Sequence, residues 1–160
     1  MNQPVPSLDV REFMNRHLVE VFSTMLSMTA TPLPQAEIPH HEERVTGSVG
    51  FAGESVHGVV YLHLSAEFAR KAAAAMLGLP LEEVTADEDI NDVIGEVTNM
   101  LTGGLKSALC DAGTPCAVST PAIIRGRSFE IEPGPGLERI WLLFDCETDR
   151  AAVEVHIRFN

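Results

Sequence analysis

The segment from about Asp87 to about Ala112 constrains the fold most, because its apolar and polar residues separate at helical spacing. At roughly 100° per residue, with Asp92 placed at zero, its apolar residues fall between about 140° and 220°. These residues are Ile94, Val97, Leu101, Leu105 and Ala108. Acidic residues in its first turns complement the helix dipole. The segment therefore predicts a long amphipathic helix with one buried and one exposed face.

The opposite face of this helix carries polar and small residues. Glu96 falls near ~40°, Asn99 near ~340° and Gly103 near ~20°, and side chains three residues apart on a helix are neighbours. A polar helix face is by default a solvated surface. However, Asn is a weak helix former, and Gly103 and Gly104 each cost about 1 kcal/mol relative to Ala. With Asp92 one turn earlier, this face is interpreted as a docking face on which Gly103 leaves room for a close approach.

The rest of the chain predicts an α+β fold in a single domain, residues 1–160. A first amphipathic helix is predicted over Asp9–Met28, stopped by the prolines of Thr31–Pro34. A shorter helix is capped by Ser65 and ends near Gly78. Strands are predicted over Val45–Phe51, Val56–Leu64, Ala122–Ile131, Ile140–Cys146 and Ala152–Phe159. Glu20–Leu26 and Glu96–Leu101 resemble each other, which indicates a duplication in which each half supplies a long helix and a β-meander.

Composition excludes several classes of function. The net charge is −12 with only 11 basic residues, so nucleic-acid and anionic-membrane binding are disfavoured. No stretch approaches the roughly 20 apolar residues of a membrane span, and Met1–Asp9 lacks a signal pattern, so a cytoplasmic location is expected. Three cysteines are expected to be reduced thiols. His40-His41-Glu42-Glu43 lacks a third ligand at a matching spacing, so no metal site is predicted, and His57, His63 and His156 are interpreted as structural.

The strip Asp92-x-x-x-Glu96-x-x-Asn99, followed by Pro121, resembles the signature of the CheC/CheX/FliY phosphatases of bacterial chemotaxis. Asn99 and Pro121 are separated by 21 residues, one fewer than in the family pattern. The segment from Gly95 to Leu109 resembles CheX in particular, as does the end of the first helix, Val21–Leu26. The resemblance in element order covers nearly the whole chain. It implies a CheC-like fold with an internal duplication, in which long helices pack on a mainly antiparallel sheet.

The resemblance also implies a function, a mechanism and partners. Such proteins hydrolyse the aspartyl phosphate of a CheY-type response regulator, which holds the Mg²⁺ itself, so no cofactor of this chain's own is expected. Asn99 would orient the attacking water, and Glu96 would dock through an ion pair with the regulator's active-site lysine. Asp92 and Gly103 would support partner binding. A homodimer joined through β-strands is expected.

Other interpretations stay open at this point. In the first helix Ser23 stands where an Asn would be needed beside Glu20, so a second site there is expected to be inactive. A non-catalytic adaptor of the same fold would bind the response regulator without hydrolysing its phosphate. A dimeric domain for an unrelated small molecule is the third alternative, and a large apolar pocket away from the helix face would favour it.

Overall fold

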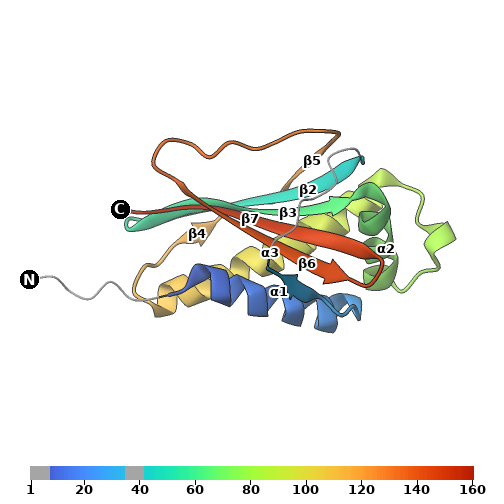
Figure 1. Ribbon diagram of the computed structural model, residues 1–160, viewed down its shortest axis with the longest axis horizontal. Coiled ribbons are helices and arrows are strands. Elements are labelled where there is room, and N and C mark those ends of the chain that lie inside the picture. Colours follow the sequence, from blue (N-terminus) through green and yellow to red (C-terminus); the bar gives the residue numbers. More distant parts are fainter. Residues whose placement is uncertain (1–7, 35–41) are drawn as a thin grey trace, which may run out of the picture.

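The computed structural model describes residues 8–34 and 42–160, which form a helical layer against one face of a β-sheet (Figure 1). The helices are α1 (Val10–Leu26), α2 (Ala66–Leu77), α3 (Asp87–Asp111) and a 3₁₀ turn, η1 (Leu81–Glu83). The strands are β1 (Thr31–Leu33), β2 (Arg44–Ala52), β3 (Val56–Ser65), β4 (Ala117–Val118), β5 (Ala122–Gly126), β6 (Glu138–Cys146) and β7 (Asp149–Phe159). The predicted α+β class is confirmed.

The sheet has two matching halves. Its strand order is β1-β6-β7-β3-β2-β4, β5 also pairs with β2, and all neighbours are antiparallel. Each half runs as a long helix, an edge segment and a hairpin: α1, β1 and β2–β3, then α3, β4–β5 and β6–β7. The edge segment of each half pairs with the hairpin of the other half. This order supports the predicted duplication but not two separate meanders.

Most predicted elements are found with bounds shifted by a few residues, and three differences have physical reasons. Thr31–Leu33, where the prolines predict the end of the first helix, also forms an edge strand. Pro32 does not prevent this strand, because a missing N–H is tolerated on a sheet edge. The two-residue β4 is too short to produce a sequence pattern. β5 ends at Gly126, not Ile131, and Ser128 then takes a left-handed conformation with φ 50°.

The core lies between the helices and the sheet. α1 contributes Met14, Leu18 and Phe22, all with no exposed surface. α3 contributes its predicted stripe, which is buried except for Ala108, which is half-buried. Burial of these stripes supplies the main favourable free energy of folding. No helix of the described residues is long and apolar enough to cross a membrane.

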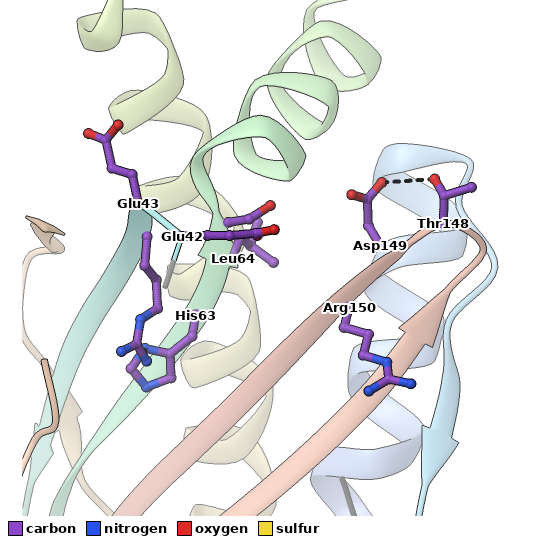
Figure 2. A pocket seen from close by; sticks show the side chains of 9 residues that line it. Glu42, Glu43, His63, Leu64, Thr148, Asp149 and Arg150 are labelled. Atoms are coloured by element: carbon purple, nitrogen blue, oxygen red, sulfur yellow. Dashed lines mark hydrogen bonds between the residues drawn. The ribbon is translucent and has the colours of Figure 1, made fainter. Parts of the chain in front are cut away.

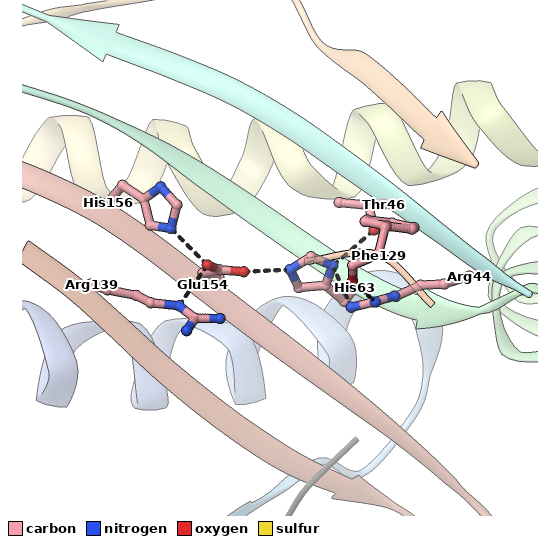
Figure 3. A network of polar contacts seen from close by, with 7 residues as sticks. All are labelled: Arg44, Thr46, His63, Phe129, Arg139, Glu154 and His156. Atoms are coloured by element: carbon pink, nitrogen blue, oxygen red, sulfur yellow. Dashed lines mark hydrogen bonds and ion pairs between the residues drawn. The ribbon is translucent and has the colours of Figure 1, made fainter. Parts of the chain in front are cut away.

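The other face of the sheet carries a buried polar network, beneath the crossing segment (residues 127–137) that runs over this face in Figure 1. Glu154 is its centre: it accepts hydrogen bonds from His63 (2.9 Å), His156 (2.6 Å) and Arg139 (2.8 Å) (Figure 3). Strand alternation predicted a polar outer side for this strand. The middle of that side is polar but not exposed, since Glu154 is 1% and His156 2% exposed.

A second set of bonds links this network to the crossing segment. Thr46 and Arg44 donate to Nδ1 of His63, over 2.8 Å and 3.4 Å, so His63 donates to Glu154 through Nε2. Arg44 also donates to the carbonyl of Phe129 and lies 4.2 Å from the centre of its ring. His63 and His156 are therefore structural, as interpreted from the sequence, whereas the central role of Glu154 was not predicted.

Candidate functional site on helix α3

Three polar side chains on the outer face of α3, those of Asp92, Glu96 and Asn99, have no partner among the residues that the structure describes. Asp92 and Glu96 are exposed and Asn99 is half-buried. Among the residues that the structure describes, none of the three side chains makes a hydrogen bond or ion pair. Glu96 and Asn99 are three residues apart on one continuous helix, so their side chains are neighbours. A carboxylate and an amide therefore remain free to bind something outside the chain.

α3 is seated directly on the sheet, which fixes this face in position. A Cβ built at Gly47 on β2 would lie 2.0 Å from Thr98 Oγ1, so only glycine permits the approach. Thr98 is fully buried and donates to the carbonyl of Ile94 over 2.7 Å. Thr98 immediately precedes Asn99, so the contact holds the backbone from which Asn99 projects. A positioned side chain on a rigid element is what a catalytic or docking group requires.

The two adjacent glycines of α3 have different roles. A Cβ at Gly104 would lie within 2.0 Å of the His17 ring on α1, and His17 also hydrogen-bonds the carbonyl of Met100 over 3.0 Å. Gly104 is therefore explained by the packing of α3 against α1. A Cβ at Gly103 would meet nothing within 4 Å. Nothing in residues 8–34 or 42–160 therefore requires glycine at position 103.

The loop after α3 returns to the same helix. Pro121, just before β5, lies beside Gly95: a Cβ built there would be 3.3 Å from Cβ of Pro121. The shorter spacing between Asn99 and Pro121 therefore still brings the proline against α3, next to the residue that precedes Glu96. From β5, Arg125 donates to Asn91 Oδ1 over 2.8 Å and lies 3.8 Å from Asp87. These contacts hold the first turns of α3 against the sheet edge.

A shallow depression of about 160 Å³ lies beside the polar face, between α2 and α3. Asp89, Asp92, Val93 and Glu96 border it from α3, and Met76 and Leu77 border it from α2. The structure thus brings Asp92 and Glu96 to one depression, as their shared face predicts. No local sequence pattern indicates Met76 and Leu77 as part of this site, because they belong to another helix and only the tertiary packing of α2 against α3 brings them there.

The corresponding face of α1 carries Glu20 and Ser23, both exposed. The hydroxyl of Thr24 donates to the carbonyl of Glu20 over 2.8 Å, which is a local helix contact. A serine hydroxyl is shorter than an asparagine amide and lacks its paired donor and acceptor. The chemistry of α3 is therefore not repeated on α1.

Two further features bear on the rival interpretations. A pocket of about 250 Å³ at the ends of β2, β3 and β7 is lined mainly by charged and polar side chains, including Glu43, Arg44 and Asp149 (Figure 2). A second depression, of about 360 Å³ beside the start of α1, is lined by charged as well as apolar side chains. Neither is the large apolar pocket that the small-molecule interpretation requires. Within 8–34 and 42–160, no group of three or more His, Cys, Asp or Glu side chains could hold a metal ion. His40 and His41 lie outside the described residues.

Comparison with known proteins identifies a family with this arrangement. Residues 45–145 match the family described as "Chemotaxis phosphatase CheX". A curated relative, the CheY-P phosphatase CheX of Thermotoga maritima, is 32% identical over 96 residues, which cover 60% of this chain. The match spans 59% of that relative's length.

Two solved structures extend the similarity to nearly the whole fold. The chemotaxis protein CheX from Vibrio vulnificus has a TM-score of 0.79 and 26% identity, covering 94% of this chain and 97% of that chain. A CheX–CheY–BeF₃–Mg²⁺ complex from Borrelia burgdorferi has a TM-score of 0.74 and 22% identity, covering 94% of this chain and 98% of that chain. The latter similarity shows a shared fold.

Proposed function

The chain belongs to the CheX family of chemotaxis phosphatases, and on that premise we propose that it is a protein phosphatase for a CheY-type response regulator. Its substrate is the aspartyl phosphate of the regulator, and hydrolysis ends the signal. One observation carries the proposal: Glu96 and Asn99 are adjacent, lack partners among the described residues, and project from a helix seated on the sheet. The name of the Thermotoga relative, CheY-P phosphatase, supports the same substrate.

In this proposal Asn99 positions the attacking water. The water oxygen attacks phosphorus in line with the bond to the aspartate oxygen, that bond breaks, and inorganic phosphate and a free carboxylate result. A neutral amide suits the task because it can accept from the water and donate to it at once. The contribution is one of orientation, which can lower the barrier without a group of unusual pKa.

Glu96 docks the partner in this proposal. Its exposed carboxylate would pair with the active-site lysine of the regulator. The Mg²⁺ that neutralises the phosphoryl oxygens would also be held by the regulator and not by this chain. Asp92, one turn before, adds a second carboxylate, and Gly103 leaves space for the regulator's backbone beside Asn99. The net charge of −12 would speed encounter with a basic partner surface.

We also propose a homodimer joined through β-strands, acting in the cytoplasm. The edge of the sheet supports this assembly: β1 pairs only with Leu143–Asp145, so the first half of β6 has no strand neighbour on that side among the described residues. Unpaired strand edges are the usual sites of strand addition. Sedimentation equilibrium would give twice the chain mass, and a single-chain mass at micromolar concentration would contradict the assembly.

The function is tested with a panel of phosphorylated response regulators. Addition of the wild-type protein is expected to speed phosphate release from at least one CheY-type regulator well above its own rate. Binding should be measured in parallel with the same regulators activated by beryllofluoride and Mg²⁺. Binding with no acceleration of release would instead support the adaptor, and neither binding nor acceleration across the panel would contradict both.

A further inference from the structure

Exposed apolar side chains gather at one corner beside the candidate site. Leu77 is 46% and Leu79 42% exposed, and they are two of the five large apolar side chains that the described residues leave exposed. Met76, half-buried, lines the depression next to Asp92 and Glu96 together with Leu77. We call Met76, Leu77 and Leu79 the apolar corner. Contiguous exposed apolar surface marks interaction sites more often than isolated exposed apolar residues do.

The apolar corner is held rigid from two sides. Gly78 ends α2 in the left-handed region, at φ 66°, and the amide of Leu79 donates back to the carbonyl of Ala74 over 3.0 Å. Arg70 then donates to the carbonyls of Leu81 and Val84, over 2.9 Å and 2.8 Å, which fixes the turn that follows. A corner fixed before binding loses little conformational entropy when a partner covers it.

Charge defines which partner surface fits this corner. Asp89, Asp92 and Glu96 border the same depression, and none of the three carboxylates has an ion-pair or hydrogen-bond partner within the described residues. An apolar side chain seated on Leu77 would therefore be stabilised further by a lysine or arginine next to it. A partner with an acidic rim would instead be repelled.

We propose that the apolar corner is a recognition surface for the response regulator. An apolar side chain of the regulator, flanked by a Lys or Arg of the regulator, would bind there between α2 and α3. The inference rests on the proposed function, and its position follows from Glu96, which borders both the depression and the candidate site. The corner contributes to holding the regulator and not to orienting water. It therefore acts on KM and on the dissociation constant, and leaves kcat unchanged.

The test compares Leu77→Ala with Ile124→Ala. Ile124 is a matched control: it is 38% exposed, and it lies on the other sheet face because its neighbour Ile123 faces Gly95 of α3. Kinetics would use a phosphorylated CheY-type regulator, and titrations would use the same regulator with beryllofluoride and Mg²⁺. We expect Leu77→Ala to raise KM and the dissociation constant about five- to tenfold, with kcat within twofold and Ile124→Ala unchanged.

A second pair of variants tests whether the regulator places a positive charge beside Leu77. Leu77→Lys should weaken binding more than Leu77→Glu, because only the lysine repels a cation on the regulator, and the difference should shrink at high salt. Unchanged binding by Leu77→Ala, or weaker binding by Leu77→Glu than by Leu77→Lys, would overturn this inference. If phosphate release still depends on Asn99, either result contradicts this inference but not the proposed function. Altered sedimentation of the Leu77 variants with unchanged regulator binding would also overturn the inference.

Discussion

At the scale of single residues, Asn99 and Glu96 have different chemical capacities although they are neighbours on α3. The amide of Asn99 carries no net charge and offers both a donor and an acceptor, which suits the orientation of a water molecule. The carboxylate of Glu96 is an acceptor with a charge, which suits attraction of a cation. The proposed function therefore separates the two: Asn99 affects the chemical step and Glu96 affects binding.

Removing the Glu96 charge is expected to weaken recognition. Glu96→Ala should raise the KM for a phosphorylated regulator about tenfold, since an interfacial ion pair is lost. The effect should be larger at low ionic strength. Asp111→Ala is the control, because it removes the same charge from the exposed far end of α3. Equal KM values for the Glu96 variant and the wild type would remove Glu96 from docking.

The sequence could predict the polar face of α3 because helix geometry is local. Asp92, Glu96, Asn99 and Gly103 share a face by their spacing alone. Met76 and Leu77 could not be placed beside them, since α2 reaches α3 only through tertiary packing. Alternation likewise placed Glu154 on the outer side of its strand, but burial there depends on the crossing segment, which no local pattern describes.

At the scale of elements, the position of α3 depends on close contacts that permit no extra atom. Gly47 meets Thr98 beneath the helix, and Gly104 meets His17 beside it. Both glycines lie on surfaces that face another element, whereas Gly103 faces open space. The helix is thus packed tightly on two sides and open on the side that carries Glu96 and Asn99.

The adjacent glycines of α3 give a matched pair of substitutions. Gly104→Ala should destabilise the fold by about 1–3 kcal/mol, because the new Cβ overlaps the His17 ring. Gly103→Ala should stabilise it by up to about 1 kcal/mol, since helix propensity improves and nothing is displaced. Urea unfolding of both variants measures the difference. Equal destabilisation by the two would contradict the assigned packing.

The same contrast between local and long-range information decides which elements were predictable. The long helices and the last strand repeat their pattern over many residues, and they were predicted closely. β1 and β4 are too short to show an alternating pattern of apolar and polar residues. Each forms a strand because it pairs with a distant segment: β1 with β6, and β4 with β2. The loop length before Pro121 differed from the family pattern, yet packing against Gly95 still brings the proline to α3.

At the scale of the molecule, the helical layer and the outer sheet face have separate roles. The helices form the core and carry the candidate site. The outer face joins β2, β3, β6 and β7 through the network around Glu154 and connects them to the crossing segment through Arg44 and Phe129. Such a network stabilises the fold only while every buried polar group keeps its partner.

This network predicts a loss of stability in acid. Burial lowers the pKa of His63 below its ordinary 6.5, against the raising effect of its hydrogen bond to Glu154. Burial alone would raise the pKa of Glu154, but the hydrogen bonds from His63 and His156 outweigh it, so the pKa falls below its ordinary 4.5. In both cases the unfolded chain binds more protons in acid, so the free energy of unfolding decreases as pH falls.

Thermal unfolding measured between pH 7 and pH 4 checks this prediction. The Tm should fall first below about pH 6.5, where His63 would protonate in the unfolded chain, and more steeply toward pH 4.5, where Glu154 would do so. His63→Gln should be less stable at pH 7 and should lose less on acidification. His57→Gln, which changes a half-buried histidine outside this network, is the control. A wild-type Tm independent of pH over this range would contradict the network's contribution.

The central claim, that α3 carries a phosphatase site, is tested most directly by single-turnover dephosphorylation of a phosphorylated CheY-type regulator. The wild type, Asn99→Ala and Ser23→Ala would be compared at saturating protein, with Ser23 as the exposed counterpart on α1. We expect Asn99→Ala to lose on the order of 100-fold or more of the acceleration while its Tm is unchanged, and Ser23→Ala to retain it. Wild-type acceleration by a folded Asn99→Ala would contradict the account.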